Sequence, residues 1–271
     1  MSIPQADPSK TEDRPFIGVW DPLTCVDEIP TPSCLSRIRQ ELSDIEDNPL
    51  PGIFVCPEDN DITRIHSIII GPAETPYEGG FFHVFVKCPA AYPAVPPHVR
   101  LMTTDAGKVS FHPKLYACGK ICLGIVGTGP GPVWTHDKGI GSVLMKIQLL
   151  LSDVITPTEA YSSVLKDKVR HDTVRVAVCD AVAACLHSNP PYPSRLARVM
   201  MKTFTESYDR YEDQIKALGE LESSRNLAHM LGVSVTYLYQ PLMSRLKNLG
   251  QEVKDKIQPS GGLTGPGSGG I

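Results

Sequence analysis

The segment from residue 112 to residue 138 has almost no periodicity and carries the side chains best suited to chemistry. It holds two thiols, Cys118 and Cys122, and two imidazoles, His112 and His136. A cysteine thiolate is a strong nucleophile that can carry an acyl group as a thioester, and a nearby imidazole can serve as a base. Loops of this length are uncommon in compact domains unless they are functional or disordered. We therefore look for a reactive group here first.

The eight cysteines of the chain could also be zinc ligands or unreactive buried residues. No two of them form the C-x-x-C pair that opens most structural zinc sites, so a zinc domain is not expected. In a reducing compartment most cysteines are small buried hydrophobic residues. A reactive cysteine has to be argued against that background.

The elements before this loop must position it. Ser33 is a suitable N-cap for an amphipathic helix that ends before Pro49 and Pro51. From Gly52 to Phe111 the pattern changes to short β-branched and aromatic runs with short connections, which favour an antiparallel meander. The predicted strands are residues 65–70, 81–87 and 99–103.

The rest of the chain is predicted to be mainly helical. The expected helices are residues 140–151, 173–186, 194–218 and 242–257. Their apolar stripes fit a core better than a cofactor site. Left unpacked, such stripes would expose an unusually large apolar surface, so we expect the C-terminal helices to pack on the preceding domain.

Three short motifs surround Cys122 in a fixed order. They are Tyr92-Pro93 with Pro96-Pro97, then His112-Pro113-Lys114, then Gly119-Lys120-Ile121-Cys122-Leu123. They resemble the motifs of the ubiquitin-conjugating enzymes, which are Tyr-Pro-x-x-Pro-Pro, His-Pro-Asn and Gly-x-Ile-Cys-Leu, with the cysteine eight residues after the asparagine. Residues 37–42 and 71–82 resemble the same family in the same order. The resemblance runs from about residue 33 to residue 159.

Further motifs are similar to class Z, a large subgroup with extensions at both ends. They are Trp20-Asp21-Pro22, the run from Gly127 to Trp134 and the run from Arg170 to Asp180. The resemblance implies an α/β fold, a four-stranded antiparallel meander flanked by helices, with a helical C-terminal extension. The implied domains are an N-terminal tail (1–32), a ubiquitin-conjugating catalytic domain (33–160), the helical extension (161–258) and a disordered tail (259–271).

The resemblance also implies the reaction. Cys122 would accept ubiquitin or a ubiquitin-like modifier from an activating enzyme as a thioester and pass it to a substrate lysine, usually with a ligase. Cysteine suits this task because its thiolate is both a good nucleophile and a good leaving group. No metal or organic cofactor is implied for this chain, since ATP belongs to the upstream step.

Two positions depart from the catalytic pattern of the family. Lys114 stands where the family has an asparagine that supports the oxyanion or the loop itself, although an ammonium group could supply charge directly. Glu159 matches by position the acidic residue of class Z that helps to orient or deprotonate the amine. Its flanks, Thr158 and Ala160, differ from the family pattern, and a solvated glutamate at a helix start is the alternative.

Three other side chains take roles from the resemblance. Trp134 lies twelve residues after Cys122 and is expected to wall the active-site groove, with a core aromatic as the alternative. Arg37 and Arg39 occupy the helix face that family members offer to the acidic receiving domain of the activating enzyme. An exposed basic pair can also be solvated surface only.

The charge balance excludes some partner classes. The chain has 26 Lys and Arg against 30 Asp and Glu, and a net charge of −4 does not attract nucleic acid or anionic membrane. No apolar stretch approaches the length of about 18 residues that suggests a membrane span. The expected partners are ubiquitin or a ubiquitin-like modifier, an activating enzyme, a ligase and protein substrates. We expect a cytoplasmic protein, with the nucleus open as a second location.

Two alternatives to an active conjugating enzyme stay open at this point. The loss of the loop asparagine at Lys114 favours a catalytically weak ubiquitin- or ligase-binding module, whereas retention of Cys122 argues against it. A thiol hydrolase would need a histidine base. His112, beside Pro113, is more simply a turn-forming residue that orders the loop, and His136 has no assigned role.

Overall fold

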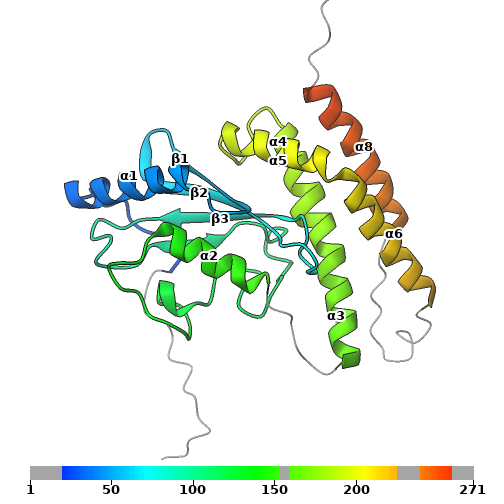
Figure 1. The fold of residues 1–271 in the computed structure, drawn as a ribbon, viewed down its shortest axis with the longest axis horizontal. Coiled ribbons are helices and arrows are strands. Elements are labelled where there is room, and N and C mark those ends of the chain that lie inside the picture. The colour runs from blue at the N-terminus through cyan, green and yellow to red at the C-terminus, as the bar shows by residue number, and fades with distance from the viewer. Residues whose placement is uncertain (1–19, 153–158, 225–238, 258–271) are drawn as a thin grey trace, which may run out of the picture.

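The computed structural model, drawn in Figure 1, describes most of the chain. The described residues are 20–152, 159–224 and 239–257. Side chains are described over the same ranges except at residues 159–164 and 220–224. The predicted disordered tail, residues 259–271, lies outside the described residues. In the described part of the chain, no helix has both the length and the apolar character needed to cross a membrane.

Four strands form one antiparallel sheet, which confirms the predicted fold class. They are β1 (Ile53–Glu58), β2 (Asp61–Ile70), β3 (Phe81–Lys87) and β4 (His98–Leu101). The sheet order is the chain order, β1-β2-β3-β4, so the strands form a meander. The strand prediction does not include β1, which has no polar–apolar alternation and is only four apolar residues followed by Pro57 and Glu58. Its pairing with β2 supplies the order that its own sequence lacks.

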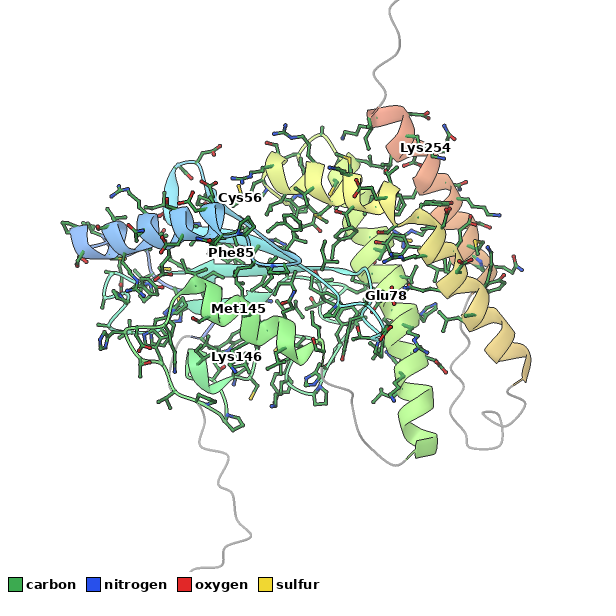
Figure 2. All side chains as sticks on the ribbon, viewed as in Figure 1. Cys56, Glu78, Phe85, Met145, Lys146 and Lys254 are labelled. Atoms are coloured by element: carbon green, nitrogen blue, oxygen red, sulfur yellow. The ribbon has the colours of Figure 1, made fainter. Side chains whose placement is uncertain are left out.

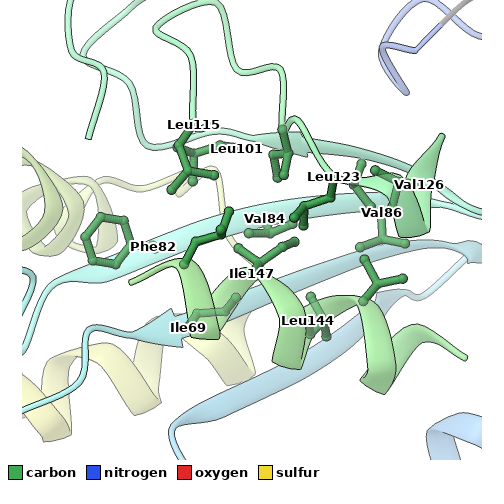
Figure 3. Packing of buried hydrophobic residues seen from close by; sticks show 14 of the residues in the cluster. Ile69, Phe82, Val84, Val86, Leu101, Leu115, Leu123, Val126, Leu144 and Ile147 are labelled. Atoms are coloured by element: carbon green, nitrogen blue, oxygen red, sulfur yellow. The ribbon is translucent and has the colours of Figure 1, made fainter. Parts of the chain in front are cut away.

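Two helices contribute to the core on one face of this sheet. They are α1 (Pro32–Asp47) and α2 (Ile140–Leu150). Figure 3 shows Val84 of β3 opposite Ile147 of α2, with Leu115 and Leu123 in the same buried cluster. The outer side of α2 turns Met145 and its neighbour Lys146 to solvent, both labelled in Figure 2. The segment that carries Cys122 is therefore anchored in the main core.

The start of α1 differs from the prediction. Thr31, rather than Ser33, is the N-cap, and its hydroxyl accepts the N–H of Cys34 at 3.2 Å. Pro32 takes the first helical position, where its fixed φ suits the helix and its missing N–H is not needed. The helix ends before Pro49, as the sequence predicts.

The opposite face of the sheet packs on the C-terminal helices. These are the π-helical η2 (Thr173–Asp180), α4 (Ala181–Leu186), α5 (Ser194–Glu206), α6 (Tyr208–Ser224) and α8 (Tyr239–Ile257). Ile68 of β2 and Phe81 of β3 are buried in one cluster with residues of these helices. The preceding α3 (Glu159–Asp172) instead contributes Val169 to the core cluster that contains residues of α1 and α2. The predicted packing of the C-terminal helices on the sheet is confirmed.

Two helix boundaries in this region differ from the prediction. The helix predicted to begin at Thr173 begins at Glu159 and continues through η2 into α4. The helix predicted over residues 194–218 is interrupted at Ser207, whose φ of −107° and ψ of 8° leave the helical region. The interruption lets Tyr208 pack closely on a glycine of α8, so a tertiary contact overrides the local helical pattern.

Ion pairs also tie η2 to the segment before the cysteine loop. Arg175 pairs with Asp105 at 3.0 Å and with Asp172 at 3.2 Å. Burial disfavours the charged form of Asp172, but hydrogen bonds from His171 and Lys168 outweigh it and lower the pKa of this carboxyl to about 2. The C-terminal helices thus hold the segment around Asp105, which precedes the loop, by ion pairs as well as by apolar packing.

The described part of the N-terminal tail lies against the sheet. The Arg100 guanidinium of β4 sits 5.7 Å from the centre of the Trp20 ring and pairs with Asp21. The Lys87 ammonium of β3 contacts Asp27 at 2.6 Å and the carbonyl of Cys25 at 3.3 Å. Residues 20–27 are thus held on β3 and β4 by charged contacts and by the ring of Trp20.

Candidate active site

Cys122 follows a short hairpin that sets the position of its backbone. Leu115 and Ile121 pair across the hairpin and are fully buried. Its turn is closed by the N–H of Gly119, which donates to the carbonyl of Tyr116 at 2.9 Å. Gly119 has a φ of +92°, and a Cβ there would lie 2.7 Å from the Leu101 carbonyl oxygen, so the turn requires glycine. Cys122 therefore directly follows a hairpin whose paired residues are anchored in the core.

The Cys122 side chain is partly exposed and lies against the following loop. Its Sγ is 3.5 Å from the carbonyl oxygen of Thr128. A Cβ added to Gly129 would lie 2.3 Å from the same sulfur. Only glycine allows the backbone to approach so closely, so the loop after η1 (Gly124–Val126) forms one wall of the thiol site.

Thr128 fastens this loop to both neighbours of Cys122. Its hydroxyl donates to the carbonyl of Ile121 and accepts the N–H of Leu123 at 3.2 Å. The N–H of Thr128 returns a bond to the Leu123 carbonyl at 3.1 Å. These bonds hold one end of the loop beside the thiol.

Lys114 and His112 lie on the other side of the hairpin. The carbonyl of Lys114 accepts the N–H of Cys122 at 2.8 Å, so its backbone is next to the cysteine. The N–H of Lys114 donates to Nδ1 of His112 at 3.0 Å. This bond gives His112 an ordering role in the turn and supports the structural interpretation over a catalytic base. The Lys114 side chain is partly exposed, and Pro113 between them is exposed.

Tyr116 is a neighbour of Cys122 that the sequence analysis did not single out. The negative charge of a Cys122 thiolate, together with burial and a hydrogen bond to it, raises the pKa of the Tyr116 phenol. Tyr116 is 42% exposed, so it lies at the protein surface next to the thiol. Thr128 and Gly129 were missed in the same way. The available signals were the hairpin turn at Gly119 and the glycine-rich run after Cys122.

Trp134 lies where the loop returns to the core. Its indole N–H donates to the carbonyl of Pro93 at 2.8 Å, and its ring centre is 5.7 Å from that of Tyr92. It is partly buried against the main core cluster. These contacts make Trp134 the anchor of the loop that reaches Cys122. Its expected place along an active-site groove stays a prediction.

The remaining predicted residues lie farther from this arrangement. Cys118 is exposed on the hairpin turn, and His136 is exposed on the loop. Arg37 is held within the fold because its guanidinium donates to the carbonyl of Lys138 at 3.1 Å, whereas Arg39 is exposed. Glu159 begins α3, and its side chain lies outside the described side chains.

The arrangement therefore offers a partly exposed thiol on a rigid hairpin, with glycine backbone against its sulfur and a phenol at its rim. No group of three or more His, Cys, Asp or Glu side chains in the described ranges is placed to hold a metal ion.

Comparison with known proteins supplies the family. A model of the family described as "Ubiquitin-conjugating enzyme" matches residues 37–186. The chain is 39% identical over 252 residues to "Ubiquitin-conjugating enzyme E2 Z" of Xenopus tropicalis, which covers 88% of this chain and 79% of that protein. Its identity to the human protein of the same name is 39% over 255 residues, or 89% and 71% of the two chains. Human "Ubiquitin-conjugating enzyme E2 T" is 35% identical over 118 residues, 44% of this chain and 57% of that one.

Proposed function

This chain belongs to the ubiquitin-conjugating enzyme family, and on that premise we propose that Cys122 is the residue that carries the modifier. The protein is a transferase that works through a cysteine thioester. The observation that supports Cys122 as the thioester residue is its place after a buried hairpin, with a partly exposed sulfur held against the Thr128–Gly129 backbone. The binding-module alternative is not favoured.

The proposed reaction has two acyl transfers at Cys122. In charging, its thiolate attacks the carbonyl carbon of the modifier's C-terminal thioester on the activating enzyme. One C–S bond forms, the other breaks, and the activating enzyme's cysteine leaves as a thiolate. In discharge, the neutral amine of a substrate lysine attacks the same carbonyl. A C–N bond forms, the C–S bond to Cys122 breaks, the amine releases one proton to solvent and Cys122 leaves as a thiolate.

We propose that Lys114 is not a required oxyanion donor. Its N–H is already bonded to His112, and its side chain is partly exposed. A lysine ammonium is strongly hydrated and flexible, so it gains little from a fixed position beside a transient oxyanion. The position tolerates a long side chain because its backbone, rather than its side chain, joins the hairpin to Cys122.

Three assignments complete the proposal. Arg39, exposed on α1, is the basic group offered to the activating enzyme, whereas Arg37 serves mainly to hold the loop through the Lys138 carbonyl. Glu159 is proposed as the acidic helper from its sequence position alone. If so, Glu159→Gln slows discharge to lysine without slowing charging, and an equal rate of discharge would refute the assignment.

The wider partners follow from the family in outline. We propose ubiquitin or a ubiquitin-like modifier, an activating enzyme and a ligase as partners, and a cytoplasmic location with the nucleus as a second site. Microscopy of a tagged chain would test the location, and a signal absent from both the cytoplasm and the nucleus would refute it.

The proposed role of Cys122 is tested by mapping the adduct. After incubation with activating enzyme, ATP and ubiquitin, peptide mass analysis should find the modifier's C-terminal glycine joined to the peptide that contains Cys122. Ubiquitin bound without any covalent adduct, or an adduct confined to another peptide, would refute the assignment.

A further inference from the structure

The carboxylate of Glu41 on α1 joins three segments that are distant in sequence. The hydroxyl of Tyr92 donates to its two oxygens at 2.8 Å, and the N–H of Ile140 donates to Oε2 at 2.7 Å. The guanidinium of Arg37 makes a further contact with Oε1. The Glu41 side chain is only 11% exposed, so this carboxylate is held inside the protein.

Glu41 supplies a helix cap that α2 does not supply for itself. The N-cap position of α2 is Gly139, which has no side chain to accept the first N–H groups of the helix. The carboxylate of Glu41 accepts the N–H of Ile140, the first residue of α2, and lies at the positive end of its dipole. A Cβ at Gly139 would lie 2.7 Å from this carboxylate, so the glycine makes room for it.

The Tyr92 hydroxyl, which donates to Glu41, is also held in place. Tyr92 is 1% exposed, and its burial together with the charge of Glu41 raises the pKa of the phenol. Tyr92 therefore stays protonated and keeps donating to Glu41 throughout the physiological range. Its ring packs on Trp134, whose indole N–H is bonded to the carbonyl of Pro93.

These contacts hold the end of the loop that reaches Cys122. One end of the loop, at Thr128 and Gly129, lies against the sulfur. The other end returns to the core at Trp134 and enters α2 after Gly139. Glu41 fixes that second end on both sides, through Tyr92 behind the tryptophan and through the first turn of α2.

We propose that Glu41 is a positioning residue for the thioester site. It acts through the loop from Gly127 to Gly139, by keeping Gly129 and Thr128 at their present distance from the Cys122 sulfur. This inference rests on the proposed role of Cys122. The alternative is that Glu41 only connects α1 to α2. In that case its replacement would lower the stability of the fold without moving the loop.

Tryptophan fluorescence separates the two roles. The chain has two tryptophans, and a Trp20→Phe background leaves Trp134 as a reporter on the loop. Glu41→Gln keeps the size of the side chain but removes its charge. The matched control is Glu46→Gln, because Glu46 lies on the same helix and forms an exposed pair with Arg195 at 2.7 Å.

We expect Glu41→Gln to increase quenching of Trp134 by acrylamide and to slow single-turnover discharge to lysine by roughly fivefold or more, since small misplacements of reacting groups are costly. Glu46→Gln should change neither. Normal quenching and normal discharge in Glu41→Gln, with or without a lower melting temperature, would overturn the inference.

A second variant protects the test if Glu41→Gln does not fold. Tyr92→Phe removes one donor and leaves the ring in place, so it should show the same two changes to a smaller degree, and no change would again overturn the inference. If the wild-type protein forms no thioester on Cys122, the proposed function fails and the catalytic inference fails with it. Normal wild-type charging with unchanged Trp134 quenching in the variants would refute the inference alone.

Discussion

Replacing Gly129 with alanine adds one methyl group where the Cys122 sulfur already lies. The new Cβ would be 2.3 Å from Sγ and 2.8 Å from the carbonyl carbon of Cys122. Non-bonded heavy atoms of this kind prefer about 3.5–4 Å, so the loop or the side chain must move by more than about 1 Å. Gly129 is not among the residues with a left-handed φ, so the effect is steric rather than conformational.

The displacement should affect both rate and stability. Misplacing reacting groups by about 1 Å can slow a reaction roughly a hundredfold, equivalent to about 2.7 kcal/mol of barrier. Overpacking of this kind also costs about 1–3 kcal/mol of folding stability. We expect Gly129→Ala to slow discharge of a preformed thioester to free lysine by at least roughly tenfold, under conditions where the variant is still folded.

The assay needs a glycine where the same substitution is harmless. Gly141 in α2 is such a site, because a Cβ there would make an ordinary 3.4 Å contact with Leu50, and alanine favours a helix. Gly141→Ala should therefore discharge at the wild-type rate. If Gly129→Ala also discharges within about twofold of wild type, with unchanged stability, the close contact between the loop and the sulfur plays no part in catalysis.

Three further results are expected. Lys114→Ala should slow single-turnover discharge by less than about threefold, because its ammonium is solvated; a loss of tenfold or more without unfolding would contradict this. The lowered pKa of Asp172 stabilises the fold above the ordinary carboxyl value of 3.8, and this contribution, about 2 kcal/mol, is lost as pH falls toward 2. The free energy of unfolding of Asp172→Asn should therefore fall less steeply than that of wild type as the pH is lowered from about 4 to about 2. Equal pH dependence of the two proteins would contradict the stabilising role of the Asp172 carboxylate. Arg39→Glu should slow charging but not discharge, whereas Arg198→Glu, on the exposed side of α5, should change neither; equal charging by the two variants would remove Arg39 from the interface.

The sequence predicts the parts of this fold whose signals are local. The β-branched and aromatic runs predict the C-terminal part of β2, the whole of β3 and most of β4, and Pro49 marks the end of α1. The boundaries that differ depend on contacts with other segments. The strand β1 is ordered by pairing with β2, and the interruption at Ser207 follows from packing on α8.

The candidate site divides in the same way. The motif order predicts the position of Cys122 and the turn role of His112, because both depend on neighbouring residues. The close approach of Gly129 to the sulfur depends on how a loop folds back. The hydrogen bond between Ile140 and Glu41 joins residues about a hundred positions apart, and no spacing in the sequence indicates it.

Formation of a thioester on Cys122 is the most direct test of the proposed chemistry. With activating enzyme, ATP and ubiquitin, the wild-type protein and Cys118→Ser should each form an adduct that is lost on adding reductant. Cys122→Ser should form no such adduct and at most a reductant-stable oxyester, because a serine hydroxyl without a base is a poorer nucleophile. A reductant-sensitive adduct that persists in Cys122→Ser and disappears in Cys118→Ser would contradict the assignment of Cys122.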